Sequence, residues 1–359
     1  MPAYPADPAY PADPAGPASA AGTAGPPGVD LARLRDHLAR HRPDLARAPL
    51  TGQLIPGGRS NLTYLVSDGR QEWVLRRPPL GHVLATAHDM AREHRVLTAL
   101  AGTAVPVPAT LLLCPDPAVL GAPFYLMERV DGTVYRTAAQ TAALTTDQRT
   151  RLARTLVDTL AALHRVDPAA VGLADFGRPD GFLARQVWRW SAQLAASRSR
   201  DLPGIDQLAT HLARTVPVSP PPAIVHGDYR LDNLLVREDR ITAVLDWEMS
   251  TLGDPLTDLG LLLVYWDRLP DPDNPIVQGV GPRHGFPPST ALTHWYAALT
   301  PTTDLSTLPW YIALASFKLA VILEGIHYRH TQGLTVGDGF EQVGALVPPL
   351  VELGLATLP

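Results

Sequence analysis

The chain has 359 residues, of which 46% are hydrophobic and 18% charged, so it can bury a sizeable core and is not disordered as a whole. Its formal net charge of -5 provides no overall attraction for nucleic acid, so no nucleic-acid partner is expected. The one cysteine, Cys114, excludes an intrachain disulfide and a cysteine-based zinc site.

Residues 1–28 are rich in proline and alanine and carry the tandem repeat Ala-Tyr-Pro-Ala-Asp-Pro. Because frequent prolines prevent helix formation and sheet pairing, we expect a disordered tail here, with an adaptor-binding tail as the alternative. The N-terminus lacks the basic and apolar segments of a signal peptide, and no uninterrupted apolar stretch reaches about 18 residues. We therefore expect a cytoplasmic protein with no membrane partner.

Residues 29–130 predict a small lobe dominated by antiparallel strands. The apolar periodicity and turn residues predict, in chain order, a short helix at 29–42, two strands around a tight turn within 54–66, a third strand at 71–76, a helix at 86–101, and strands at 109–114 and 123–129. Strands surrounding one helix indicate a small antiparallel N-lobe of the α+β class.

The pattern of residues 131–359 predicts a larger helical C-lobe. Helices are expected at 147–165, 183–197, 205–215, about 258–266, about 289–299 and about 308–331. Two short apolar runs at 233–236 and 241–245 predict a small hairpin inside this helical lobe. The apolar run at 309–323 is interrupted by Lys318, so a buried helix explains it better than a membrane span.

The segment 224–236 carries the residues with the clearest chemistry. His226, Asp228 and Asn233 match the spacing His-x-Asp-x-x-x-x-Asn of a kinase catalytic loop, and Asp246 begins the Asp-Trp-Glu that stands where kinases have Asp-Phe-Gly. Asp228 is the candidate that orients the acceptor hydroxyl and takes its proton. Asn233 and Asp246, on facing strands of the hairpin, can provide the oxygen ligands that Mg²⁺ requires. We expect His226 to support the loop by hydrogen bonding.

This segment could also arise without a kinase function, in either of two ways. The first is a chance His-x-Asp among scattered acidic residues, which four matches in order make improbable. The second is a metal hydrolase that uses His226 and Asp228, but no second histidine cluster accompanies them, because His327 and His330 lie far along the chain.

The sequence resembles the aminoglycoside phosphotransferase-like (choline/aminoglycoside kinase-like) family, and within it the kinase-like domain fused to some acyl-CoA dehydrogenases. The resemblance covers roughly residues 45–335 and is carried by 56–64, 73–79, 87–97, 121–132, 226–233 and 245–260. It implies a protein-kinase-like bilobal fold and Mg²⁺-dependent transfer of a phosphoryl group from ATP or GTP to a hydroxyl of a small molecule.

The resemblance also implies a role for residues of the N-lobe in binding the nucleotide. Glu93 would pair with the basic residue of the third strand, where Arg76 replaces the usual lysine. Arginine keeps the charge, and strand alternation places Arg76, rather than Arg77, on the face of Val74. The phosphate-covering loop would be Gly57, Gly58, Arg59, Ser60 and Asn61, and the hinge would be Met127, Glu128, Arg129 and Val130.

The acceptor would lie beyond Asp228 among the C-lobe helices, and Asp258 would serve as a helix N-cap and support the loop. A buried Glu324 would need a partner, for which Lys318 or His327 is expected. Core packing is the alternative role for each acceptor candidate. These candidates are Trp247, Glu248, Trp266, Lys318, Glu324, His327, Tyr328 and Arg329.

A polycationic aminoglycoside calls for a cleft rich in acidic residues, and outside the catalytic region the C-lobe is not conspicuously acidic. Its apolar helices suit an amphiphilic hydroxy compound better, and the resemblance to the dehydrogenase-linked domain implies a hydroxyacyl-CoA thioester or a related hydroxy acid. The expected function is therefore a Mg²⁺/ATP-dependent small-molecule kinase. The alternatives are an aminoglycoside phosphotransferase, a plain structural module, and a nucleotide-binding pseudokinase that regulates a partner such as an acyl-CoA dehydrogenase. Retention of Asp228, Asn233 and Asp246 argues against a pseudokinase.

Overall fold

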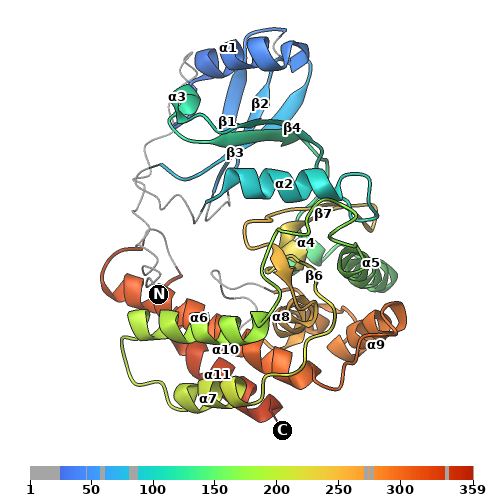
Figure 1. Ribbon diagram of the computed structural model, residues 1–359, viewed down its shortest axis with the longest axis vertical. Coiled ribbons are helices and arrows are strands. Elements are labelled where there is room, and N and C mark those ends of the chain that lie inside the picture. The colour runs from blue at the N-terminus through green and yellow to red at the C-terminus, as the bar shows by residue number, and fades with distance from the viewer. Residues whose placement is uncertain are drawn as a thin grey trace. The chain divides into compact units, whose positions relative to one another are not determined.

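The computed structural model describes residues 25–45, 47–56, 61–80, 88–270, 274, 279–335 and 339–358. They divide into two compact units (Figure 1). One contains the described residues up to Ala101 together with Val107–Asp131, and the other contains Gly102–Pro106 and the residues from Gly132 on. The expected phosphate-covering residues Gly57, Gly58, Arg59 and Ser60, and most of the expected tail, lie outside the described residues.

The first unit is built on a five-stranded sheet of order β1-β2-β3-β5-β4, in which every neighbouring pair is antiparallel, as the sequence predicts. The helices α1 (Leu31–His41), α2 (Met90–Leu100) and α3 (Pro117–Leu120) accompany it. The strands are β1 (Thr51–Leu54), β2 (Leu62–Ser67), β3 (Glu72–Arg77), β4 (Thr110–Cys114) and β5 (Phe124–Glu128).

Strand β3 shows why Arg76 and Arg77 differ. Trp73, Leu75 and Arg77 alternate on the buried face, and the first two pack into the core of this unit. Arg77 donates hydrogen bonds to the carbonyl oxygens of Gly28 and Leu120 and is therefore a structural residue. The prediction that Arg76, on the opposite face, faces Glu93 is confirmed below.

The last residues of the expected tail, 25–28, make defined contacts with the sheet and with Val29, just before α1. The hydroxyl of Tyr64 donates to the carbonyl oxygen of Pro27 at 2.6 Å, and the N–H of Val29 donates to that of Pro26 at 3.0 Å. Arg77 fixes the next residue, Gly28. Side chains of the sheet thus hold a turn that composition alone does not reveal.

The second unit is mostly helical and contains the predicted hairpin, β7 (Leu234–Arg237) with β8 (Arg240–Val244). A further two-stranded pair, β6 (Ala223–Val225) with β9 (Thr251–Gly253), was not predicted because each strand has only three residues. Short 3-10 turns include η2 (Leu231–Asn233) and η4 (Val343–Leu346). The helices are α4 (Ala138–Thr141), α5 (Thr146–His164), α6 (Phe182–Ser197), α7 (Ile205–Arg214), α8 (Leu256–Asp267), α9 (Ser289–Leu299), α10 (Leu308–Thr331) and α11 (Val347–Thr357).

Helix α10 is the core helix of this unit and packs against α6, α7, α8 and α11 (Figure 1). Its length and composition would suffice to cross a membrane, but 78% of its most apolar window is buried inside the protein. Phe317 and Val321 are among its fully buried residues. The prediction of a buried helix is thus confirmed, and this helix carries Lys318 to the catalytic loop.

Candidate active site

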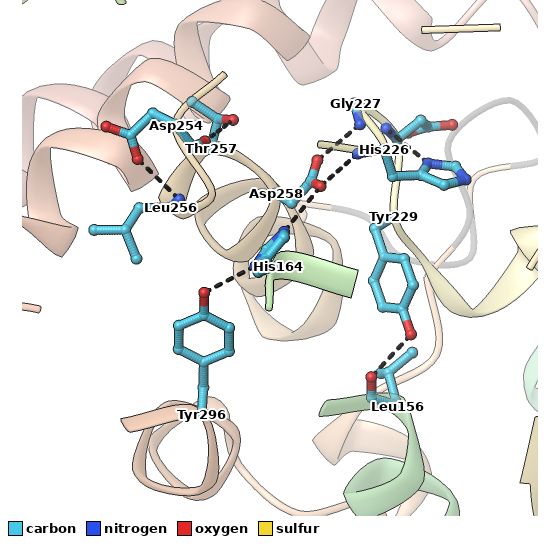
Figure 2. Close-up of polar contacts among 11 residues, drawn as sticks. Leu156, His164, His226, Gly227, Tyr229, Asp254, Leu256, Thr257, Asp258 and Tyr296 are labelled. Atoms are coloured by element: carbon cyan, nitrogen blue, oxygen red, sulfur yellow. Dashed lines mark hydrogen bonds and ion pairs between the residues drawn. The ribbon is translucent and has the colours of Figure 1, made fainter. Parts of the chain in front are cut away.

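One buried carboxylate holds the start of the catalytic loop. Asp258 accepts hydrogen bonds from the backbone N–H of His226 at 2.7 Å and of Gly227 at 2.8 Å, one on each of its oxygens (Figure 2). Two successive amides that meet one carboxylate fix the loop just before Asp228. The expected supporting role of Asp258 is present in these contacts.

The expectation that Asp258 caps a helix is wrong. Helix α8 begins at Leu256 with Pro255 at its N-cap position, so Asp258 is the third residue of the helix. Asp254 instead accepts the N–H of Leu256 at 3.0 Å (Figure 2). Because Asp254 accepts this N–H at the start of α8, the carboxylate of Asp258 is available to the catalytic loop.

Asp258 is itself supported from helix α5. His164 Nε2 lies 3.3 Å from Asp258 Oδ2, and His164 Nδ1 lies 2.8 Å from the hydroxyl of Tyr296 on α9 (Figure 2). Burial acts to raise the pKa of Asp258, but the hydrogen bond and charge of His164, together with His226, outweigh it and lower the pKa below its usual value. Asp258 therefore remains an ionised acceptor.

Sequence reasoning missed His164 and Tyr296. A signal was present for His164, which follows Leu160 by four residues and so falls on the apolar stripe of its helix. A polar ring on a buried stripe needs partners. The sequence carries no indication that these partners are Asp258 and Tyr296, because the three residues come from different helices.

The side chain of His226 braces the loop from within. Its Nδ1 accepts the N–H of Asp228 at 3.2 Å, so the ring proton lies on Nε2, which donates to the carbonyl oxygen of Leu245 at 2.8 Å. The predicted supporting role of His226 is therefore seen in its contacts.

Trp247 packs with its ring centroid 4.8 Å from that of His226 and donates to the carbonyl oxygen of Val244, and it is only 1% exposed. Trp247 is thus a packing residue, and its expected place in the acceptor wall is wrong.

Asn233 contacts Asp228 directly. Its Nδ2 donates to the carbonyl oxygen of Asp228 at 2.8 Å and to the carboxylate Oδ2 at 3.0 Å. The two expected metal ligands flank the hairpin and do not lie on its facing strands: Asn233 ends η2, and Asp246 follows the end of β8 with φ of 63°. The N–H of Leu245 donates to the carbonyl oxygen of Asn233 at 2.8 Å, which ties the two ends together.

The oxygen donors near this loop fit Mg²⁺ bound through a phosphate. Asn233 directs its Nδ2 at Asp228, which leaves its Oδ1 as an acceptor, and Asp246 contributes a carboxylate. In the described part of the chain, no group of three or more histidine, cysteine, aspartate or glutamate residues is arranged to hold a metal. Mg²⁺ is commonly held by one or two carboxylates together with substrate phosphates. The donor set suits a metal whose coordination a nucleotide completes.

Lys318 approaches the loop from helix α10. Its Nζ donates to the carbonyl oxygen of Gly227 at 2.7 Å and lies 5.6 Å from the ring centroid of Trp190. Burial lowers the pKa of Lys318, while the negative charges of Asp228 and Asp258 act to raise it. The lysine is thus part of the immediate setting of the catalytic loop.

In the sheet-containing unit, Glu93 gathers the side chains expected to serve the nucleotide. It is 2% exposed and accepts from Arg76 Nε at 3.1 Å, from Asn61 Nδ2 at 2.7 Å and from the hydroxyl of Tyr125 at 3.0 Å. The expected contact between Arg76 and Glu93 is present. Asn61 is buried in the same network, and its expected role in covering phosphates remains a prediction.

The expected hinge lies at the end of β5. Met127 and Glu128 are its last two residues, and the N–H of Glu128 donates to the carbonyl oxygen of Ala109 at 2.8 Å. Arg129 pairs with Glu72. The contact of the hinge, including Val130, with a nucleotide base stays a prediction.

Glu324 is fully buried, but its partners are not the expected ones. It accepts from the N–H of Ser199 at 3.2 Å, from the hydroxyl of Ser199 at 2.8 Å and from Arg200 Nε at 3.1 Å. These contacts bind α10 to the segment between α6 and α7, so the expected pairing with Lys318 or His327 is wrong. They give Glu324 a structural role and do not support contact with an acceptor.

The acceptor candidates His327 and Glu248 have different settings. His327 lies against Gly344 of η4, and its buried Nδ1 has no hydrogen-bond partner among the described residues. Glu248 is part-buried next to Trp247 in the sequence. A contact of either residue with an acceptor stays a prediction.

Comparison with known proteins establishes the family. The sequence model of the phosphotransferase enzyme family matches residues 51–288. The chain belongs to this family. It is 36% identical over 340 residues to acyl-CoA dehydrogenase family member 11 of Rattus norvegicus, a match that covers 91% of this chain and 43% of that protein. The chain therefore spans less than half the length of the curated relatives that it matches first.

Solved structures agree with the family assignment. A proposed aminoglycoside phosphotransferase from Ralstonia eutropha is 33% identical, with a TM-score of 0.80 over 91% of this chain and 98% of that one. The GDP complex of aminoglycoside 2'-phosphotransferase-IIIa is 17% identical, with a TM-score of 0.60 over 92% and 100% of the two chains, and supports the fold alone. The predicted kinase-like α+β fold, with a small antiparallel sheet lobe and a helical lobe, is confirmed.

Proposed function

We propose that this phosphotransferase moves the γ-phosphoryl group of ATP or GTP to a hydroxyl of a small molecule, with Mg²⁺ as cofactor. The observation that carries the proposal is the geometry around Asp228. Its backbone is held through His226 and Gly227, and Asn233 donates to one of its carboxylate oxygens at 3.0 Å. A carboxylate fixed in this way is suited to receive a proton from a bound hydroxyl.

The reaction assigned to these residues is a single displacement at the γ-phosphorus. Asp228 accepts the hydrogen bond of the acceptor hydroxyl and takes its proton as the hydroxyl oxygen bonds to the γ-phosphorus. The bond from that phosphorus to the β–γ bridging oxygen breaks, and the nucleoside diphosphate leaves. Asn233 and Asp246 would hold Mg²⁺, which would supply positive charge to neutralise the phosphates.

Arg76 is the proposed contact to the phosphates of the nucleotide. Its Nε donates to Glu93 at 3.1 Å, which orients the guanidinium, and the planar fork of a guanidinium matches the geometry of phosphate oxygens. Members of this fold have been captured with nucleotide, as in the GDP complex of aminoglycoside 2'-phosphotransferase-IIIa. This supports a nucleoside triphosphate as the donor.

For the acceptor we propose a hydroxyacyl-CoA thioester or a related hydroxy acid. The similarity to acyl-CoA dehydrogenase family members supports it. The charge near the loop supports it as well, since the ammonium of Lys318 lies beside Gly227 and close enough to Asp228 for their charges to interact.

Thermal unfolding with ATP and with GTP, each with and without Mg²⁺, tests the nucleotide site. A ligand at about 100 times its Kd adds about 2.7 kcal/mol, or roughly 2–4 °C for a protein of this size. We expect a Mg²⁺-dependent rise that Asp246→Asn reduces and that Glu352→Gln, at an exposed position on α11, leaves intact. Absence of a rise with either nucleotide would contradict the proposal.

The acceptor is tested by transfer of label from the γ-³²P nucleotide. The panel contains hydroxyacyl-CoA thioesters, the corresponding free hydroxy acids and aminoglycosides. We expect label on the thioesters or the hydroxy acids. Transfer to aminoglycosides alone would keep the phosphotransferase assignment and overturn the acceptor.

A further inference from the structure

The residue that precedes Asp228 is held by hydrogen bonds at both its N–H and its carbonyl oxygen. The N–H of Gly227 donates to Asp258 on α8 at 2.8 Å, and its carbonyl oxygen accepts from Lys318 Nζ on α10 at 2.7 Å. Gly227 has φ of 87°, and a Cβ at this position would lie 2.8 Å from the backbone oxygen of Met249. The residue therefore has little freedom, and its two anchors determine the direction in which the chain enters Asp228.

The lysine that forms this contact is unusual in the chain. Lysine and arginine together number 30, and Lys318 is the one lysine among them. An ammonium is a compact donor at the end of a flexible stem, whereas a guanidinium is a broad planar fork. The carbonyl oxygen of Gly227 is a single acceptor, which a compact ammonium fits better than a planar guanidinium does. This explains a lysine at position 318 in a chain whose other lysine or arginine residues are all arginines.

We propose that Lys318 is a positioning residue for phosphoryl transfer, which acts by holding the Gly227 carbonyl and so aiming the carboxylate of Asp228. The proposal rests on the proposed function for the role of Asp228, but not for the contact itself. Lys318 extends the support that Asp258, His164 and His226 give to the loop from the other side. It differs from them because it also places a positive charge beside the site.

That charge suggests a competing role, in which Lys318 binds an anionic acceptor directly. The two roles separate in kinetics. A residue that aims Asp228 affects turnover, whereas a residue that binds the acceptor in its ground state affects KM. The substitution Lys318→Met removes the ammonium and keeps an unbranched apolar side chain. Arg214→Met, at an exposed position at the end of α7, removes the same charge away from the loop and is the matched control.

The first test measures transfer of ³²P from γ-labelled nucleotide, both to the acceptor identified in the panel and to water. For Lys318→Met we expect turnover to fall about 10–100-fold, since misplacement of a reacting group by about 1 Å costs up to about that much. The acceptor KM and the nucleotide-induced thermal shift should stay close to wild type. A raised KM with unchanged turnover would overturn the positioning role.

The second test measures the local opening of the catalytic loop and needs no transfer reaction. Amide hydrogen exchange across 224–233 should become faster in Lys318→Met and stay unchanged in Arg214→Met. Unchanged exchange in both would overturn the proposal. If wild type transfers label to no acceptor while exchange behaves as expected, the proposed function fails and the contact of Lys318 with the loop stands.

A third test restores the ammonium chemically. In Lys318→Cys, alkylation with 2-bromoethylamine rebuilds a side chain of nearly lysine length that ends in an ammonium. The chain's other cysteine, Cys114, is buried, and burial raises the pKa of its thiol, so it reacts poorly. We expect alkylation to recover most of the lost turnover. Because position 318 is itself part-buried, the comparison uses protein in which mass spectrometry confirms alkylation at that position. The same folded protein is compared before and after alkylation, so loss of folding in Lys318→Met does not affect this result, and failure of the alkylated protein to recover turnover would count against the proposal.

Discussion

Asp258 holds His226 through the backbone of the histidine and leaves its imidazole to make separate contacts. The N–H of His226 lies 2.7 Å from Asp258 Oδ2, while the ring bridges the N–H of Asp228 and the carbonyl of Leu245. One residue therefore links α8, the catalytic loop and the end of β8. The position of Asp228 depends on this buried network as well as on its own local sequence.

Asp258→Asn should destabilise the protein in a manner that depends on pH. Replacing the carboxylate disrupts a buried hydrogen-bonded charge network, which typically costs about 3–5 kcal/mol. The pKa of Asp258 is lowered in the folded state, so its contribution is complete above its unfolded value of about 3.8 and is lost as the pH falls through the lower folded value.

Urea unfolding of wild type and Asp258→Asn between pH 3 and pH 7 measures this contribution. The difference in unfolding free energy should be constant from about pH 5 upward and should shrink below about pH 4. A difference that grows as the pH falls would show that the pKa of Asp258 is raised in the folded protein.

Arg76→Met and Arg76→Lys should behave differently. The first leaves the buried carboxylate of Glu93 without its cation, which should cost about 3–5 kcal/mol of unfolding free energy and abolish the nucleotide-induced thermal shift. The second keeps a cation on the same face of β3 and should retain both folding and nucleotide binding, with an affinity within about tenfold of wild type. Calorimetric titration measures the nucleotide affinity of both variants. Equal loss of affinity in the two would show that a positive charge at position 76 is not sufficient for nucleotide binding.

Glu324→Gln should affect stability and not catalysis. It weakens charge-assisted hydrogen bonds from Ser199 and Arg200, each of which is worth about 1.5–3 kcal/mol when a charged group is involved. We expect a lower urea midpoint with an unchanged acceptor KM and turnover below the melting temperature. A selective increase in acceptor KM would restore Glu324 as a substrate residue.

Much of the fold follows from local sequence, because its helices and strands carry clear periodicity. The strand β3 alternates strictly, so the distinct faces of Arg76 and Arg77 are predictable. Two apolar runs around a charged turn are likewise enough to predict the hairpin. The pair β6 and β9 escapes prediction because three-residue strands carry too few positions to show a period.

The catalytic motif is predictable because its residues are close in sequence, whereas their supports are not. Asp228 and Asn233 contact each other across five positions, a separation that a motif can encode. His164, Tyr296 and Lys318 reach the same region from three different helices. Glu324 shows the same limit, since its partners at 199 and 200 lie more than a hundred positions away.

The most direct test of the proposed mechanism compares wild type and Asp228→Asn in transfer of ³²P from γ-labelled nucleotide to the identified acceptor. Asparagine keeps the size of the side chain but cannot take the hydroxyl proton. We predict that turnover falls about 10²–10⁴-fold while the Mg²⁺-dependent thermal shift with nucleotide remains. Full activity in Asp228→Asn would contradict the assignment of Asp228 as the base and with it the proposed mechanism.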